Sequence, residues 1–196
     1  MDTDRDMQSL QQRVGRIEAE LAIRSLPSRY ARAADARDIG TLVGLFVDDV
    51  DCGSLGRGRE VLAGVMTDAL QRFYRSIHMV CCQVIDEIDG AAATGTTYCR
   101  AEQEAGGRWM VTPLMYVDRY EQRDGQWLFA RRVPRLWYAA DILERPGDGG
   151  FHTWPEMASF KASLPATFRT WDGFWSELSN DDVATRTVDP VRRHPA

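Results

Sequence analysis

Three glycine-containing dipeptides set the strongest limit on how this chain can fold. Asp89-Gly90, Gly106-Gly107 and Asp124-Gly125 follow one another at spacings of 17 and 18 residues. Such pairs favour the tight turns whose twist matches antiparallel strands, and alternating or β-branched sequence flanks each of them. We therefore predict four long strands joined as an antiparallel meander, at residues 76–88, 91–104, 108–122 and 126–138.

Helical patterns precede these strands. An apolar stripe is formed by Leu10, Val14, Ile17 and Leu21, which recur at spacings of 4, 3 and 4. Pro27 is expected to break or kink this helix, because proline removes a backbone donor. Helical turns resume in RYARAADARD and again in REVLAGVMTDALQRFY. This order predicts the α+β class, with a strongly curved mixed or antiparallel sheet wrapped around N-terminal helices and enclosing an apolar pocket.

The turns also predict a strand register, provided that no bulge interrupts it. Counted outward from the turns, one cross-strand row contains His78, Ala101, Thr112 and Trp137. Charged side chains of the second strand share the face opposite to Ala101, so the row of His78 is expected to face the pocket. Further side chains predicted to line the pocket are Gln103, Met110, Leu114, Tyr116, Val133 and Arg135.

The role of Arg135 stays open at this stage. Its guanidinium is suited to clamp an anionic group of a substrate. The run RRVPR around it is equally compatible with a solvated end of the strand. The apolar side chains of the predicted pocket face are likewise explained by core packing alone, although in a hollow cone they would also form a binding pocket.

The other face of the third strand is too apolar to be left in water. It is predicted to carry Trp109, Val111, Pro113, Met115 and Val117. We therefore expect a homo-oligomer that buries this face.

Composition excludes some classes of function. The net charge of −5 and the pI of about 5.3 disfavour nucleic acid as a partner. No apolar run approaches the roughly 18 residues of a membrane span, and the start of the chain lacks a signal-peptide core, so we expect a cytoplasmic protein without a membrane partner. Metal-ligand spacings are absent, and we expect no metal and small, free core residues at Cys52, Cys81, Cys82 and Cys99.

The domain organisation follows from shifts in composition. Residues 1–140 are expected to form one domain. Residues 141–180, rich in aromatic side chains, are expected to form a helical appendage that covers the pocket or a subunit interface. Residues 181–196 have the composition of a disordered tail.

Asp35 has two interpretations, since it could end a solvated helix or point into the pocket. A base and a proton donor are needed to eliminate water or halide beside a carbonyl group. An imidazole can act as both, because its ordinary pKa is about 6.5, and a carboxylate can orient and charge it.

Tyr30 could donate a hydrogen bond to the leaving oxygen, or it could be a core aromatic. Tyr30 and Asp35 lie about 140° apart around an ideal helix, so they converge only if the helix ends or unwinds at Asp35.

Five motifs in order resemble one protein family. RYxxxxDxxD, LFxxDV, a GR-helix, SIHMV and YVDRYEQRDGQWLFARR together resemble the SnoaL-like branch of the NTF2-like superfamily, over roughly residues 10–140. The resemblance implies a cone-shaped α+β fold, often trimeric, with a dimer as our second choice. It also implies cofactor-free elimination by an Asp–His pair, with Asp35, His78 and Tyr30 at the matching positions. Two departures are Gln103, near a second family histidine, and residues 52–54, where a pocket tyrosine is replaced.

The resemblance and the residues together favour a cofactor-independent lyase or isomerase that acts on a hydrophobic, polycyclic or aromatic small molecule. One alternative is a cyclase or hydrolase of polyketide-like substrates. The other is a module that binds small molecules or proteins without catalysis, because one fold hosts many functions.

Overall fold

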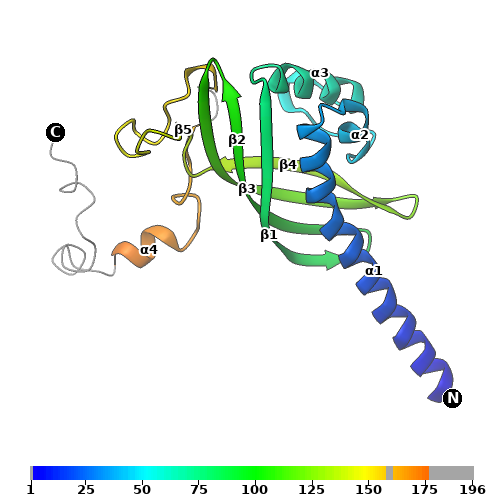
Figure 1. The fold of residues 1–196 in the computed structure, drawn as a ribbon. Helices are drawn as coiled ribbons and strands as arrows, with labels where there is room; N and C mark the ends of the chain where they lie inside the picture. The colour runs from blue at the N-terminus through cyan, green and yellow to red at the C-terminus, as the bar shows by residue number, and fades with distance from the viewer. Residues whose placement is uncertain (1, 158–160, 177–196) are drawn as a thin grey trace.

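A computed structural model describes residues 2–157 and 161–176, and in it helices cover one face of a curved sheet (Figure 1). The helices are α1 (Asp2–Asp35), α2 (Ile39–Gly44), α3 (Arg59–Leu70) and α4 (Trp171–Ser176), with 3-10 turns at Gly53–Leu55 and Pro155–Met157. The strands are β1 (Arg75–Asp89), β2 (Ala92–Ala105), β3 (Arg108–Arg123), β4 (Gln126–Leu136) and β5 (Ala140–Asp141). The predicted α+β class is confirmed.

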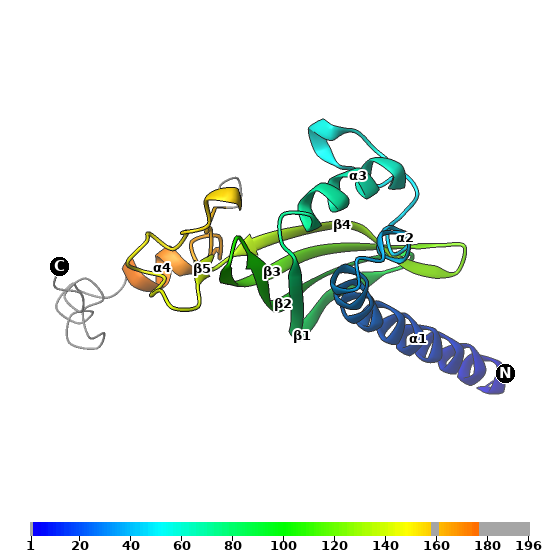
Figure 2. The same cartoon turned by 45° about the horizontal axis from the view of Figure 1, so that its top comes forward.

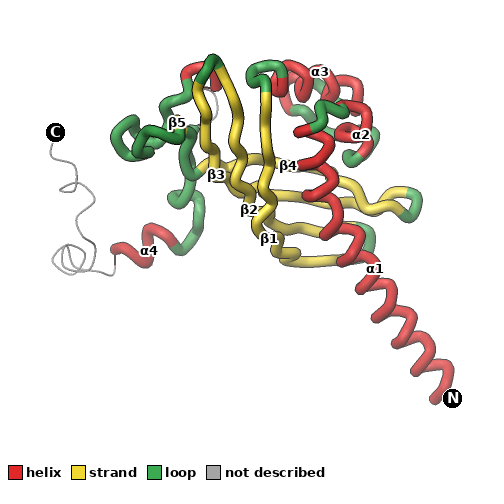
Figure 3. The backbone as a smooth tube through the Cα atoms, viewed as in Figure 1, coloured by secondary structure: helices red, strands yellow, loops and turns green. Residues whose placement is uncertain are grey.

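The sheet is an antiparallel meander in the order β1-β2-β3-β4, and β5 pairs with β3 (Figure 3). All four predicted strands are present, with ends within two residues of the prediction. α1 and α3 lie against the concave side (Figure 2), and the core between sheet and helices includes Ile23, Leu26, Leu42 and Phe129, each fully buried.

The pairing of β1 with β2 agrees with the prediction at His78, although the turn and the regularity of β1 differ from the prediction. His78 faces Ala101 as predicted. Near the turn, however, Asp89 pairs with Ala92, so the turn lies one residue later than expected. Two bulges along β1 then shift the register back, one residue at a time. The predicted pocket face at His78 is therefore correct because two bulges cancel the displacement of the turn.

The pairing of β3 with β4 contains one bulge that the prediction lacks. Tyr120 pairs with Phe129, whereas Arg119 pairs with Arg131, so Ala130 is the extra residue. Side chains alternate along a strand, and the extra residue therefore exchanges the two faces of β4 beyond it. The predicted pocket positions of Val133, Arg135 and Trp137 are wrong for this reason. The inner face is instead taken by Arg132, Pro134 and Leu136.

α1 continues through Pro27, so the predicted break is wrong. Proline leaves one carbonyl of the preceding turn without its helical partner, here that of Ile23. The side-chain amide of Gln83 on β1 donates a hydrogen bond to this carbonyl at 3.4 Å. Because the sheet supplies the missing donor and the Pro27 ring is fully buried, the helix runs on.

The chain itself covers part of the outer face of β3. Val111 and Met115 are buried within a single chain, while Val117 remains 41% exposed. The segment after β5 lies over this face, where the rings of Trp137 and Phe168 are 6.1 Å apart. Part of this row is therefore already buried within one chain, and a homo-oligomer that buries the rest of the face stays a prediction.

The segment after residue 140 is mostly irregular rather than helical. Among its described residues, the helical turns are Pro155–Met157 and α4. The predicted tail, 181–196, lies outside the described residues. Within residues 2–157 and 161–176, no helix combines the length and the apolarity that are needed to cross a membrane.

Candidate active site

Asp35 and His78 meet where the end of α1 crosses the start of β1. Nδ1 of His78 lies 2.7 Å from Oδ1 of Asp35, and the backbone N–H of His78 donates to Oδ2 at 2.8 Å. The Ser76 hydroxyl also donates to Oδ1, at 2.7 Å. The side chains are nearly buried, with His78 9% and Asp35 24% exposed. Ser76 and His78 are two residues apart on β1 and share one face of it, so a single strand supplies all three donors.

These donors determine the charge state of the pair. Burial raises the pKa of Asp35, but hydrogen bonds from the ring and backbone of His78 and from Ser76 outweigh it, and the net pKa is lowered. An ionised Asp35 can only accept a hydrogen bond, so Nδ1 of His78 must carry the proton. In a neutral imidazole the lone pair is then on Nε2. The arrangement therefore provides an oriented imidazole with one free basic nitrogen.

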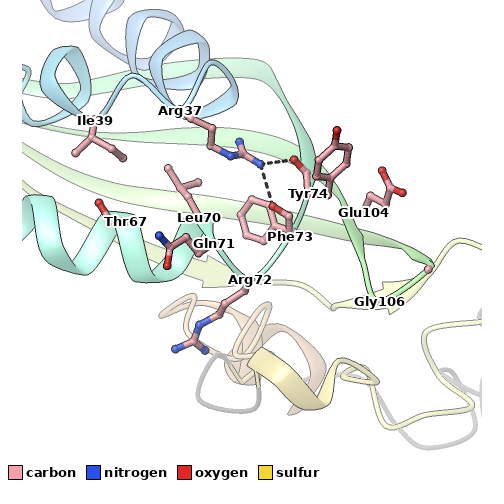
Figure 4. A pocket seen from close by; sticks show the side chains of 11 residues that line it. Arg37, Ile39, Thr67, Leu70, Gln71, Arg72, Phe73, Tyr74, Glu104 and Gly106 are labelled. Atoms are coloured by element: carbon pink, nitrogen blue, oxygen red, sulfur yellow. Dashed lines mark hydrogen bonds between the residues drawn. The ribbon is translucent and has the colours of Figure 1, made fainter.

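Arg37 stabilises the Asp35–His78 pair through Ser76, a role that the sequence did not reveal. Its guanidinium donates to the Ser76 hydroxyl at 2.8 Å. It also donates to the carbonyls of Phe73 and Tyr74 at 3.2 Å each (Figure 4). Because the Ser76 oxygen accepts from Arg37, its hydrogen is left to point at Asp35. The neighbouring groove of ≈ 540 Å³ in Figure 4 is lined by neither Asp35 nor His78, so it is not the candidate active site.

His78 lines a smaller, mainly apolar cavity of ≈ 240 Å³, while Asp35 lies behind it. The predicted residues Tyr30, Gln103, Leu114 and Tyr116 also line this cavity. Met110 is fully buried but is not among the lining residues. Helix α3 contributes further apolar wall residues, namely Leu62, Val65, Met66, Ala69 and Leu70.

A buried cation lies in the wall opposite α3. The Arg132 side chain is 3% exposed and its Nε is 3.4 Å from Oδ1 of Asp118, which is fully buried. The guanidinium carbon lies 3.9 Å from the ring centre of Tyr116 and 4.6 Å from that of Tyr30. Sequence reasoning missed Arg132 because the bulge at Ala130 decides which arginine of the RRVPR segment turns inward.

Tyr30 belongs to an aromatic cluster in the cavity wall. Its ring packs edge-on against Phe46, Tyr116 and Phe129 at 5.9–6.2 Å between centroids. Burial raises the pKa of Tyr30, although Arg132 beside it acts in the opposite direction. Its hydroxyl is therefore a proton-bearing donor at neutral pH, and its ring is at the same time a core aromatic.

The C-terminal segment contributes to the wall of the cavity. His152, Trp154 and Met157 line it, and the Trp154 ring is 3% exposed and 6.2 Å from that of Phe73. The aromatic-rich stretch FHTWP was the only sequence signal for this contact. Among the described residues, no group of three His, Cys, Asp or Glu side chains is arranged as metal ligands.

The comparisons with known proteins agree with this architecture. The model of the SnoaL-like domain matches residues 15–133, more than half of the chain. This chain belongs to the SnoaL-like domain family. This is the family that the motifs resemble. No curated protein matches the chain.

Three solved structures show the likeness of this SnoaL-like protein to others. A hexachlorocyclohexane dehydrochlorinase, LinA-type3 from Novosphingobium barchaimii, has 21% identity and a TM-score of 0.61 over 67% of this chain and 95% of its own. A Novosphingobium aromaticivorans protein, provisionally described as a scytalone dehydratase, has 21% identity and a TM-score of 0.58 over 67% and 92%. An NTF2-like protein from the same organism has 20% identity and a TM-score of 0.53 over 66% and 88%. At these identities the likeness concerns the fold.

Proposed function

We propose that this SnoaL-like protein is a cofactor-independent lyase or isomerase, with dehydratase-type elimination as its reaction. The observation that carries the proposal is the 2.7 Å contact between Asp35 and His78, with the imidazole lining an apolar cavity. The names of the similar solved structures, a dehydrochlorinase and a provisional dehydratase, point in the same direction.

In the proposed reaction, Nε2 of His78 takes a proton from a carbon beside an electron-withdrawing group. The electrons of the C–H bond form the new double bond, and the bond to the leaving hydroxide or halide breaks. Asp35 stabilises the imidazolium that forms, and the imidazolium returns its proton to a leaving hydroxide, which departs as water. In an isomerisation, the same proton returns to another carbon of the substrate.

The polar groups of the cavity wall are suited to stabilise the substrate oxygen on which negative charge develops during the reaction. Tyr30 and Tyr116 keep their protons, because burial raises the pKa of both phenols. Arg132 stands against both rings and adds a positive charge in a site of low exposure. We assign Tyr30 to hydrogen bonding with a carbonyl or leaving oxygen, because fixed donors stabilise an oxyanion without reorganising.

The cavity limits the substrate. Small-molecule sites commonly have roughly 300–1,000 Å³, and the cavity of ≈ 240 Å³ lies below that range. Its lining is mainly aliphatic and aromatic, and its polar groups are those of Tyr30, His78, Gln103, Thr112, Tyr116, Arg132 and His152. We therefore favour a compact cyclic or aromatic molecule over a polycyclic one.

Two other functions use the same cavity. A cyclase or hydrolase of polyketide-like substrates would need the same base but would yield a ring closure or a hydrolysed product. A non-catalytic binding module would hold a ligand without turnover. The partly buried carboxylate of Asp35, which accepts three hydrogen bonds from Ser76 and His78, favours catalysis, because binding an apolar ligand requires no such pair.

The test begins with a screen for ligands. Aromatic and alicyclic alcohols, halides and ketones are added to the purified chain, and a rise in melting temperature identifies binders by mass action. Binders are then assayed for turnover, with product identity distinguishing elimination, isomerisation and cyclisation. A set of binders without any turnover would identify a binding module.

The pair is then tested in a double-mutant cycle. His78→Ala should lower turnover by roughly 10²–10⁴-fold with the fold intact, and Asp35→Asn should lower turnover with little loss of binding. The double variant should lose far less than the product of the two single losses, because residues that act as a unit fail together. Asp86→Asn, at an exposed position of the same strand, is the matched control and should keep full turnover. Multiplicative losses would show that Asp35 and His78 act independently.

A further inference from the structure

The N-terminal half of α1 extends away from the body of the molecule. Ile23 and Leu26 are fully buried against the sheet, and Ala19 and Ala22 still pack against the core. The turns before Ala19 project beyond the sheet (Figures 1 and 2). We call residues 4–22 the arm. The match to the SnoaL-like domain begins only at residue 15, so the first turns of the arm lie outside that domain.

The arm presents a stripe of large apolar side chains to solvent. The exposed fractions are 54% for Met7, 51% for Leu10, 44% for Val14, 58% for Ile17 and 64% for Leu21. These are the five large hydrophobic side chains of the arm, and all five are exposed. A stripe of this kind on a helix that already projects from the body is typical of an interaction surface.

The spacing of the stripe specifies the kind of partner. The intervals of 3, 4, 3 and 4 residues place Met7, Val14 and Leu21 at a positions, and Leu10 and Ile17 at d positions, of a heptad repeat. This is the narrow seam of a coiled coil rather than the wider stripe of a helix lying on a sheet. The matching surface for such a seam is another helix with the same repeat.

The charges that flank the seam are complementary between two parallel copies. Arg13 occupies a g position and Glu18 the following e position. In a parallel, in-register pair the g side chain of one helix meets the e side chain of the other, five residues later. Two copies of this chain would thus form Arg13–Glu18 ion pairs on both sides of the seam. The remaining flanking pairs, Asp6 with Gln11 and Glu20 with Ser25, place no like charges together.

We propose that the arm pairs with the arm of a second copy of this chain in a parallel coiled coil. A free helix of this length is marginal in water, because its nucleation is unfavourable. Here the buried turns from Ile23 onward already form the helix, so the arm needs only a partner for its seam. The inference is independent of the proposed chemistry at His78.

The test measures the mass of the full chain by sedimentation velocity over a concentration series. The wild-type chain is expected to form a dimer, and the variant Val14→Lys/Ile17→Lys is expected to sediment as a monomer over the same range. Lysine is a better helix former than valine or isoleucine, so the arm stays helical in this variant. The control Gln8→Lys/Gln12→Lys adds the same charge on the opposite side of the helix and should leave the dimer intact. A monomeric wild type, or a dimer that survives Val14→Lys/Ile17→Lys, would overturn the proposal.

A charge reversal tests the parallel register. Arg13→Glu should weaken the dimer, because it places a second carboxylate against that of Glu18 in the other copy, and Arg13→Glu/Glu18→Arg should restore the dimer. Since the reversal changes no apolar side chain, a failure to fold cannot imitate its result. If the double variant dimerises no better than Arg13→Glu alone, the parallel arrangement is wrong.

Discussion

At the residue scale, the position of Asp35 at the last turn of α1 explains its hydrogen bonds. The dipole at the C-terminal end of a helix disfavours a carboxylate there. Three donors from β1 offset this cost, and Arg37 fixes one of them through Ser76. Arg37 has a φ of 59°, which turns the chain sharply once the helix has ended. Asp35 is therefore directed at β1 because the helix ends at that residue.

The pH dependence of stability tests this account of Asp35. The folded-state pKa is lowered below its ordinary value of 3.8, so the unfolded chain binds more protons in acid. The stabilisation is thus fully present above that value and is lost as the pH falls through the lower, folded-state pKa. Asp35→Asn removes the charge and should cost about 1–3 kcal/mol of unfolding free energy at pH 7, with a smaller cost at about pH 3.

Urea unfolding at the two pH values provides the measurement. Asp86→Asn is the control, and at neutral pH it should change the unfolding free energy by less than about 0.5 kcal/mol, as surface substitutions usually do. An Asp35→Asn deficit of equal size at both pH values would contradict the proposed role of the charge.

At the element scale, a single bulge decides which side chains of β4 reach the cavity. Ala130 is the extra residue, and beyond it Arg132 turns inward and Arg135 outward. The inward side chain of Arg132 is accommodated because it forms an ion pair with Asp118. The Asp118 carboxylate also accepts hydrogen bonds from the hydroxyls of Thr97 and Tyr120, at 3.0 Å each. A buried charge of this kind is tolerated only with its partner.

Substitution of the two arginines tests the bulge directly. Arg132→Met leaves Asp118 buried without a counter-charge and should lower the unfolding free energy by about 3–5 kcal/mol. Arg132→Met/Asp118→Asn removes both charges and should be more stable than Arg132→Met. Arg135→Met is the matched control at an exposed position, with an expected change below about 0.5 kcal/mol. A strand without the bulge would give the reverse result, with Arg135→Met the costly change.

At the scale of the whole molecule, the cavity is completed by parts that are distant in sequence. Helix α3 and the inner sheet face form most of its wall, and His152, Trp154 and Met157 add to it. Trp154 anchors this C-terminal segment, since its indole is buried beside Phe73. The segment lies beyond residue 133, where the match to the SnoaL-like domain ends.

Removal of this anchor should affect both stability and binding. Trp154→Ala deletes a buried ring and should cost about 3–5 kcal/mol of unfolding free energy. It should also lower the affinity for ligands that are found in the thermal-shift screen. Trp171→Ala is the control, because Trp171 is 36% exposed on α4 and does not line the cavity. Urea unfolding and ligand titration measure the two effects. Ligand affinity unchanged in Trp154→Ala would mean that the C-terminal segment does not contribute to the site.

The meander, the α+β class and the family could be predicted from the amino-acid sequence, because tight turns and side-chain alternation are local properties of the chain. The pairing of Asp35 with His78 was predicted only through the family resemblance, because the local sequence left two interpretations open for Asp35. Other features depend on contacts that form only in the folded chain. The bulge at Ala130, the donor that Gln83 supplies to the helix at Pro27 and the place of Trp154 in the cavity wall depend on sheet curvature and on contacts between distant segments. Such contacts leave no local pattern, and for this reason Arg132 rather than Arg135 faces the cavity.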